Sequence, residues 1–360
     1  MYEFSLPTKV VFGQGAIEKI GEEITKLKKE IPLHYLIVTM GERWAKELAG
    51  KIKNALMEVG GKKIEIFDQI EPNPTRGCIK KGVDFSRRCQ SQVIVALGGG
   101  SSMDAAKVIA REAKLDLLVT LPTTAGTGGE ISPWAVIINE KTREKESIIA
   151  KVPDLALLDP DLTLSMSPSL TLLTGIDAFS HALEAYMSKA ANSLTDALAF
   201  KALELVKQHI FIAIEEGKNI KAREKMLEAS LLAGIAMLHA GLGLIHAIAN
   251  TLGGLYPHLP HGWIIIPLLR KVSEFNRPAN PDKFAKIERY IDKIEAGIHR
   301  IAEQGGLEDF PSVSIRREDL ELLIKRSLNN INATTNPVDF TYQDVKKIII
   351  QSFQLSTLSH

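Results

Sequence analysis

Residues 92–107 have the sequence Gln-Val-Ile-Val-Ala-Leu-Gly-Gly-Gly-Ser-Ser-Met-Asp-Ala-Ala-Lys. Its apolar first part predicts a buried strand, the three glycines a tight turn, and the remainder the start of a helix. Glycines let the main chain approach a phosphate closely, and a helix N-terminus adds about half a positive charge. The stretch therefore predicts a strand-turn-helix unit suited to phosphate, although it lacks the G-x-G-x-x-G pattern and such a run often forms only a tight turn.

A second glycine-rich stretch, residues 122–130, has the sequence Pro-Thr-Thr-Ala-Gly-Thr-Gly-Gly-Glu. It follows another apolar run and supplies hydroxyl groups together with a flexible backbone. Two such loops in succession favour a nucleotide-binding site over a pair of simple turns.

Apolar runs alternate with amphipathic stretches through the first part of the chain. The runs at residues 35–39, 63–67, 92–97, 117–121 and 155–158 predict strands. The stretches at residues 18–29, 43–59 and 103–113 have helical periodicity. Strands that alternate with helices indicate a parallel sheet.

From about Ser167 onward the pattern changes to long helices with few strand-like runs. Helical periodicity is clear at residues 194–214, 222–239 and 282–304. The sequence therefore predicts two domains: an α/β dinucleotide-binding domain with a parallel sheet at residues 1–163, and an all-helical metal-binding and catalytic domain at residues 164–360.

The composition is that of an ordinary soluble globular protein, with 360 residues, 45% of them hydrophobic and 24% charged. A net charge of +1 implies no bulk attraction to nucleic acid or to an acidic membrane. No apolar run reaches the roughly eighteen residues of a membrane span, and residues 1–12 lack the features of a signal peptide. Cys78 and Cys89 are too few for a disulfide framework. We expect a cytoplasmic protein without nucleic-acid or membrane partners.

The residue types and spacings of a divalent-metal site occur in the second half of the chain, at Asp177, His181, His246 and His261. The first two lie four residues apart, so on a helix both side chains project from one face. Residues 247–260 predict the end of an apolar helix, a break at residues 253–254, and a loop that folds the last ligand back. A single histidine is more often a core or surface residue, but one carboxylate and three imidazoles together suit Fe(II) or Zn(II). We expect the active site in the cleft between the domains.

Five motifs resemble, in order and over essentially the whole chain, those of the iron-containing (group III) alcohol dehydrogenase family. They are the two glycine-rich stretches, Leu158-Asp159-Pro160, residues 175–186 and Pro260-His261-Gly262. The resemblance implies a dehydroquinate synthase-like fold, with an α/β dinucleotide-binding domain followed by an all-helical domain that holds the metal through Asp177, His181, His246 and His261. It also implies cofactor contacts from Asn73, Gly99, Ser101, Asp104, Thr123, Thr124, Thr127 and Lys145. Gly98 and Gly100 complete the expected phosphate turn.

Two positions depart from the family pattern. Many members carry a further histidine four residues after the third ligand, thought to help proton transfer, and here Asn250 stands in its place. We expect protons to leave either through water and the cofactor ribose or through His258 as a catalytic residue. His258 can equally be an ordinary loop residue. NAD-selective members often carry Asp at the position of Met40 to repel a 2′-phosphate, and Arg43 follows closely. We therefore place Met40 at the cofactor and expect NADP to be accepted.

Together these patterns predict a metal-dependent, NAD(P)-linked alcohol dehydrogenase or aldehyde reductase that uses Fe(II), or alternatively Zn(II), on a small alcohol or aldehyde. The alternatives are a glycerol dehydrogenase-like, dehydroquinate synthase-like or maleylacetate reductase-like enzyme, or a nucleotide-binding protein without catalysis. We also expect a homodimer, because a strand around residues 4–11 is available for edge pairing.

Overall fold

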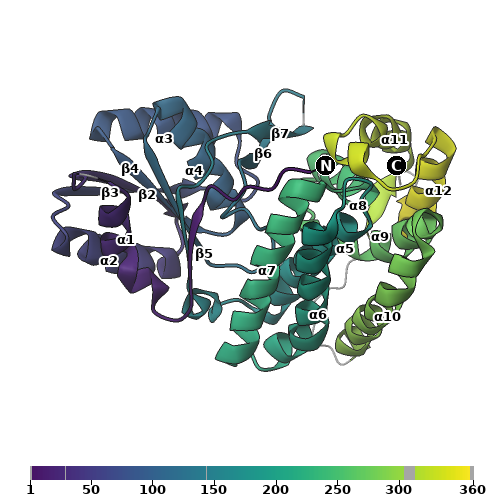
Figure 1. The fold of residues 1–360 in the computed structure, drawn as a ribbon. Helices are drawn as coiled ribbons and strands as arrows, with labels where there is room; N and C mark the ends of the chain where they lie inside the picture. Colours follow the sequence, from purple (N-terminus) through teal and green to yellow (C-terminus); the bar gives the residue numbers. More distant parts are fainter. Residues whose placement is uncertain (1, 29, 143, 304–312, 357–360) are drawn as a thin grey trace. The chain divides into compact units, whose positions relative to one another are not determined.

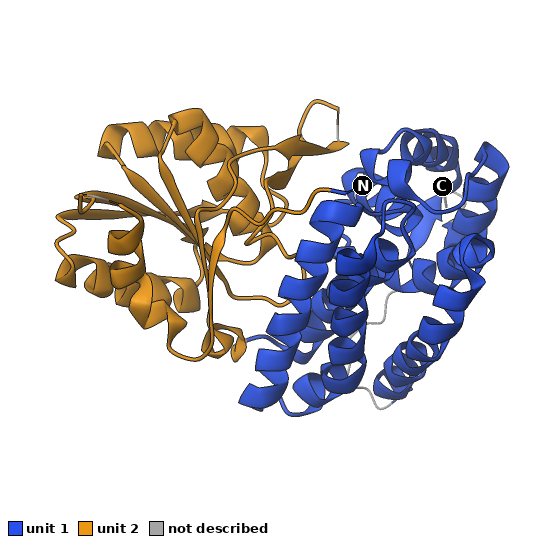
Figure 2. Cartoon of the chain, viewed as in Figure 1, with its two compact units in different colours: residues 1–2, 166–360 blue, residues 3–165 orange. Residues whose placement is uncertain are grey.

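The computed structural model describes residues 2–28, 30–142, 144–303 and 313–356. Contacts divide the chain into two compact units: residues 3–165 form one, and residues 166–360 with the first two residues form the other (Figure 2). The first unit combines a parallel sheet with helices, and the second is mainly helical (Figure 1). The predicted fold class is confirmed.

The first unit is built on a six-stranded parallel sheet with the order β1-β8-β5-β4-β2-β3. Its strands are β1 (Lys9–Phe12), β2 (His34–Met40), β3 (Lys63–Ile70), β4 (Val93–Gly98), β5 (Leu117–Pro122) and β8 (Leu155–Leu158). Its helical segments are η1 (Ala16–Lys19), α1 (Ile20–Leu27), α2 (Arg43–Glu58), α3 (Arg76–Cys89), α4 (Gly100–Ala113) and η2 (Pro160–Thr163). Every residue of β4, β5 and β8 is buried, which is typical of a parallel sheet covered on both faces.

Alternate side chains of each strand enter one of two apolar cores. In β2, Leu36 and Val38 pack in the core shared with α3 and α4, whereas Tyr35 and Ile37 pack in the core shared with α1 and α2. β2 and β4 are neighbours, and the chain leaves them toward opposite edges of the sheet, to β3 and to β5. Ligands of open α/β sheets bind beyond the carboxyl ends of the strands at such a switch point. Here those ends are Met40 and Gly98.

The second unit contains eight α-helices in the described residues: α5 (Pro168–Met187), α6 (Ser193–Glu215), α7 (Ile220–Ala240), α8 (Leu244–Leu255), α9 (His261–Asn276), α10 (Pro281–Glu303), α11 (Leu320–Leu328) and α12 (Tyr342–Ser352). Short segments complete it: η3 (Arg277–Ala279), η4 (Arg317–Asp319), η5 (Ile331–Thr335), and the parallel pair β9 (Ser314–Arg316) and β10 (Gln354–Ser356). Ser167 starts α5 by accepting a hydrogen bond from the Leu170 N–H, with Pro168 at the first helical position. Because α5 packs against α6, α7 and α9, it is buried almost all round.

Three local predictions were wrong. The break expected at residues 253–254 is absent, because α8 continues to Leu255 and both glycines are buried in it. Burial of this part of α8 outweighs the roughly 1 kcal/mol cost of glycine in a helix. The strand expected around residues 4–11 is confined to Lys9–Phe12, which pairs in parallel with β8. The helix expected at residues 18–29 begins as a 3-10 turn and ends at Leu27, and residue 29 lies outside the described residues.

Further elements were not anticipated: α3, the small pair β9 and β10, and an antiparallel hairpin of β6 (Trp134–Asn139) and β7 (Glu144–Ile149). Residue 304, the expected end of the helix now seen as α10, lies outside the described residues. Within the described ranges no single helix is long and apolar enough to cross a membrane; α7 and α8 together meet the length and composition criteria but are bent by 101°.

Candidate functional site

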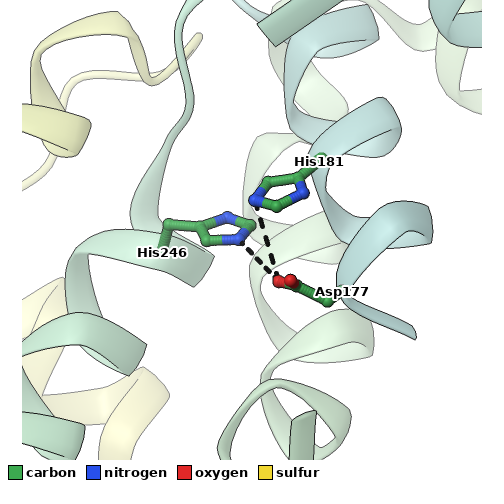
Figure 3. A group of neighbouring side chains, drawn as sticks. All are labelled: Asp177, His181 and His246. Carbon is green, nitrogen blue, oxygen red and sulfur yellow. Dashed lines mark hydrogen bonds and ion pairs between the residues drawn. The ribbon is translucent and has the colours of Figure 1, made fainter. Parts of the chain in front are cut away.

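The four residues of the predicted metal site come together in the second unit. Asp177 and His181 project from α5, and His246 lies in the first turn of α8 (Figure 3). His261 is the first residue of α9. The Nε2 atoms of the three histidines lie 3.7, 3.5 and 3.8 Å, in chain order, from Oδ1 of Asp177. The α8–α9 turn therefore returns the last histidine to the others.

This arrangement fits a divalent ion. Ligand atoms of Asp177, His181 and His246 all lie within 4.8 Å of one another. Four ligands at about 2.0–2.1 Å around a tetrahedral ion would be separated by roughly 3.3 Å, close to the observed spacings. The first three side chains are buried, whereas that of His261 is 27% exposed. Access to the site is therefore easiest beside His261.

The electrostatics of the site favour positive charge. Burial alone would raise the pKa of Asp177, but the imidazoles of His181, His246 and His261 outweigh it and hold that pKa well below its usual range. Burial acts to lower the pKa of His246, yet its bonds with Asp177 and with Glu184 raise that pKa to about 9. A cation can take the place of the protons that this cluster would otherwise hold.

Sequence reasoning missed Glu184, although it lies on α5 seven residues after Asp177 and so on the same helical face. Its buried carboxylate contacts Nδ1 of His246 at 2.6 Å and accepts the Ile245 N–H at 2.6 Å. The available signal was the spacing of Asp177, His181 and Glu184, which places three side chains of metal-ligand type on one face of the helix.

His258 lies exposed in the turn between α8 and α9, where its ring meets that of Tyr256 at 6.1 Å between centroids. Asn250 lies on α8, one turn beyond His246 and half-buried. A role of His258 in proton transfer stays a prediction.

The two glycine-rich loops of the first unit lie against each other. A Cβ added to Gly99 would lie 3.1 Å from Oγ1 of Thr124, and one added to Gly100 would lie 2.8 Å from Cγ2 of Thr127. Gly98 has φ +145°, and its carbonyl accepts the N–H of Thr123 at 3.0 Å. Such close approach explains why this turn consists of glycines.

The start of α4 leaves backbone donors available for an anion. Its N-cap residue is Gly99, which offers no side-chain cap. Ser101, in the first turn, accepts the Asn73 N–H through Oγ at 3.2 Å, so the loop before α3 reaches this point. Asn73 has a left-handed backbone, with φ 56°. These features suit a phosphate at the helix N-terminus.

Asp104 already has partners within the unit. It accepts hydrogen bonds from the Val136 N–H at 2.9 Å and from Nζ of Lys107 at 3.3 Å. Lys107 is fully buried and also donates to the Trp134 carbonyl at 2.8 Å. Both residues thereby hold β6 against α4. The hairpin carries Lys145 on β7, opposite Ile138 of β6.

Comparisons with known proteins agree with both halves of this description. Residues 7–160 match the iron-containing alcohol dehydrogenase family, and residues 171–353 match the C-terminal part of the Fe-containing alcohol dehydrogenase family. The 1,3-propanediol dehydrogenase of Citrobacter freundii is 34% identical over 98% of this chain and 99% of its own length. The NAD-dependent methanol dehydrogenase of Bacillus methanolicus is 31% identical over 97% and 99%.

Solved structures show the same similarity. A 1,3-propanediol oxidoreductase structure aligns with a TM-score of 0.88 and 33% identity, covering 98% of this chain and 100% of that one. A structure of an iron-containing alcohol dehydrogenase aligns with a TM-score of 0.87 and 31% identity, covering 98% and 99%. The chain belongs to the iron-containing alcohol dehydrogenase family.

Proposed function

We propose that this alcohol dehydrogenase transfers hydride between a nicotinamide cofactor and a small alcohol or aldehyde at a metal held by Asp177, His181, His246 and His261. The observation that carries the proposal is the convergence of three imidazole Nε2 atoms on one carboxylate oxygen at 3.5–3.8 Å. A bound divalent ion supplies Lewis-acid polarisation of a substrate oxygen.

The chain's own residues prepare this site. Three neutral imidazoles and one carboxylate leave a bound divalent ion with a net positive charge, which favours an electron-rich oxygen. Burial of Asp177, His181 and His246 keeps water from one side, and the partly exposed His261 marks the side open to substrate. We propose Fe(II) as the metal because the family is named for iron. Zn(II) is the alternative, because the same donor atoms also bind it.

We propose that the dinucleotide binds at the ends of β2 and β4, with its phosphates at Gly98, Gly99, Gly100 and Ser101. Thr123, Thr124, Thr127, Asn73, Asp104 and Lys145 are the further proposed contacts. Two glycine-rich loops in contact at a switch point support this placement.

We propose further that NADP is accepted beside NAD. Met40 ends β2 without the carboxylate that repels a 2′-phosphate. The nearby Arg43 is exposed and paired with Glu47 at 2.9 Å, so it can exchange that partner for a phosphate. Glu42, which accepts a hydrogen bond from Trp44, is the acid nearest in sequence to Met40, and its negative charge acts against binding of a 2′-phosphate.

Matched kinetics with NADPH and NADH test this proposal. We expect Met40→Asp to lower kcat/KM for NADPH more than for NADH, and Glu42→Gln to act in the opposite direction. A strong NADH preference of the wild type, unchanged by Glu42→Gln, would contradict it.

A small linear aldehyde is the proposed substrate, because relatives with 31–34% identity are named for methanol, 1-propanol and 1,3-propanediol. We propose a cytoplasmic homodimer acting as an aldehyde reductase. β1 is an edge strand of the six-stranded sheet, next to β8, so its outer side can pair with a strand of a second copy. Sedimentation that shows only monomer would remove the dimer.

The decisive experiment strips the protein of metal and reloads it anaerobically with Fe(II), Zn(II) or buffer before a panel of small aldehydes is offered with NADPH and NADH. We expect metal to restore oxidation of the cofactor. His261→Ala should abolish turnover while dinucleotide binding remains, and His258→Gln tests the exposed histidine in parallel. Dinucleotide binding without oxidation under any condition would favour a synthase-like or binding-only protein.

A further inference from the structure

A buried carboxylate connects α5 to the start of α8. Glu184 lies on the face of α5 that also carries Asp177 and His181, and its side chain is 3% exposed. Oε1 accepts the Ile245 N–H at 2.6 Å, and Oε2 contacts Nδ1 of His246 at 2.6 Å. Both oxygens are therefore engaged in the first turn of α8.

The contact with Glu184 determines which nitrogen of the His246 ring carries the proton. An ionised carboxylate can only accept, so Nδ1 must donate. In the neutral ring Nε2 then keeps its lone pair, and this atom lies 3.5 Å from Oδ1 of Asp177. A lone pair directed at this point is what a metal ligand requires.

The carboxylate of Glu184 also acts as the capping acceptor at the start of α8. The N-cap residue of α8 is Gly243, which has no capping side chain. Glu184 accepts the Ile245 N–H, and Oδ1 of Asn336 accepts the Leu244 N–H at 3.2 Å. A Cβ on Gly243 would lie 2.9 Å from Oε1 of Glu184 and 2.8 Å from Oδ1 of Asn336. Glycine at position 243 therefore leaves room for both acceptor oxygens to reach the N–H groups at the start of α8.

Asn336 continues the polar contacts to the helix that carries the fourth ligand. Its amide exchanges hydrogen bonds with that of Asn276, at 3.0 and 2.9 Å, and both residues are buried. Asn276 ends α9, which begins with His261. One buried polar chain therefore links α5, α8 and α9.

We propose that Glu184 is a positioning residue that holds His246 with Nδ1 protonated and Nε2 directed at the metal. This inference rests on the proposed metal-dependent function and deepens it. Loss of a carboxylate that supports a metal-binding histidine typically lowers metal affinity about 10–100-fold.

Glu184→Gln separates the charge of the side chain from its shape. The Ile245 N–H can only donate, so in the variant it hydrogen-bonds to the amide oxygen of Gln. The NH₂ group of Gln then faces Nδ1 of His246. Nδ1 has to accept, which moves the ring proton to Nε2, on the metal side. We expect the Co(II) affinity of the metal-stripped protein, measured by competition with a chromophoric chelator, to fall about 10–100-fold. An unchanged Co(II) affinity overturns the proposal.

A second measurement uses the wild type and does not depend on the folding of a variant. In Zn(II)-loaded protein labelled with ¹⁵N-histidine, we expect the ring proton of His246 on Nδ1 and slow exchange of this proton with solvent. A proton on Nε2, or coordination through Nδ1, overturns the proposal.

Asn336→Ala is the matched control, because it removes a neighbouring acceptor and leaves the pair of Glu184 and His246. We expect a lower Tm, because Asn336 caps α8 and also exchanges hydrogen bonds with Asn276, and a change in Co(II) affinity of less than about threefold. An affinity loss equal to that of Glu184→Gln would assign the effect to helix capping and overturn the proposal. Wild-type protein that binds no Co(II) but still binds NADPH would instead contradict the proposed metal-dependent function itself.

Discussion

Glu130 closes the second glycine-rich loop and carries a carboxyl group buried within the dinucleotide unit. The residue is 1% exposed, and its Oε1 has no hydrogen-bond partner among the described residues. Burial raises the pKa of Glu130 to about 7, from an ordinary value of 4.5, against the smaller opposing effects of its own backbone N–H and of Lys107. The substitution Glu130→Gln keeps the shape of the side chain and removes its ability to ionise.

The magnitude follows from this difference in pKa. A carboxyl whose pKa is raised by folding costs stability once it ionises, so the contribution of Glu130 to stability is most favourable below pH 4.5, falls between pH 4.5 and 7, and stays lower above pH 7. A rise from 4.5 to about 7 corresponds to a loss of about 3 kcal/mol. We therefore expect Glu130→Gln to match the wild type at pH 4 and to exceed its stability by about that amount at pH 8.

Thermal unfolding between pH 4 and pH 8 measures this effect. For a unit of this size, about 3 kcal/mol corresponds to a Tm difference of roughly 6–12 °C. The exposed Glu58 on α2 provides the control, since Glu58→Gln should leave the curve unchanged. Parallel curves of Tm against pH for Glu130→Gln and the wild type would refute the reasoning.

Gly100, His246 and Arg223 each make their contacts within a single unit and can be tested separately. Gly100→Ala should raise the Kd for NADPH at least about tenfold, because its Cβ would lie 2.8 Å from Thr127; Gly50→Ala, whose Cβ meets nothing within 4 Å, is the control in the same fluorescence titration. Co(II) affinity should fall about tenfold per pH unit below about pH 9, because the metal must displace the proton that His246 then holds; chelator titrations that show no pH dependence would contradict this. Arg223→Met should lower the free energy of unfolding by about 3–5 kcal/mol, because the carbonyls of Gly217 and Met166 would lose the donor that the buried guanidinium supplies; an unchanged denaturation midpoint would contradict this.

The sheet could be predicted from the sequence because its central strands are buried on both faces. The apolar runs at residues 117–121 and 155–158 lie within β5 and β8 as the structure has them. The glycine turn was equally visible, because Gly98 has φ +145° and a Cβ on Gly100 would lie 2.8 Å from Cγ2 of Thr127, so both positions favour glycine. Helix periodicity placed Asp177 and His181 on one face in the same way.

Other features depend on contacts that no local pattern contains. The contacts of Glu184 exist only because Ile245 of α8, sixty-one residues later in the chain, lies against it. The continuation of α8 through residues 253 and 254 depends on burial, which opposes the local preference of glycine. The hairpin of β6 and β7 is held by Asp104 and Lys107 of α4, so its stability comes from elsewhere in the chain.

The placement of Asp177, His181 and Glu184 on one face of α5 also determines which mutations this enzyme tolerates during evolution. Each added residue rotates the remainder of a helix by about 100°. An insertion between His181 and Glu184 would leave the first two side chains paired and turn Glu184 away from α8. Insertions and deletions should therefore be excluded from residues 177–184, while substitutions at the intervening positions stay possible. A designer could treat this segment and the first turn of α8 as a fixed-length cassette for transfer into another helical scaffold.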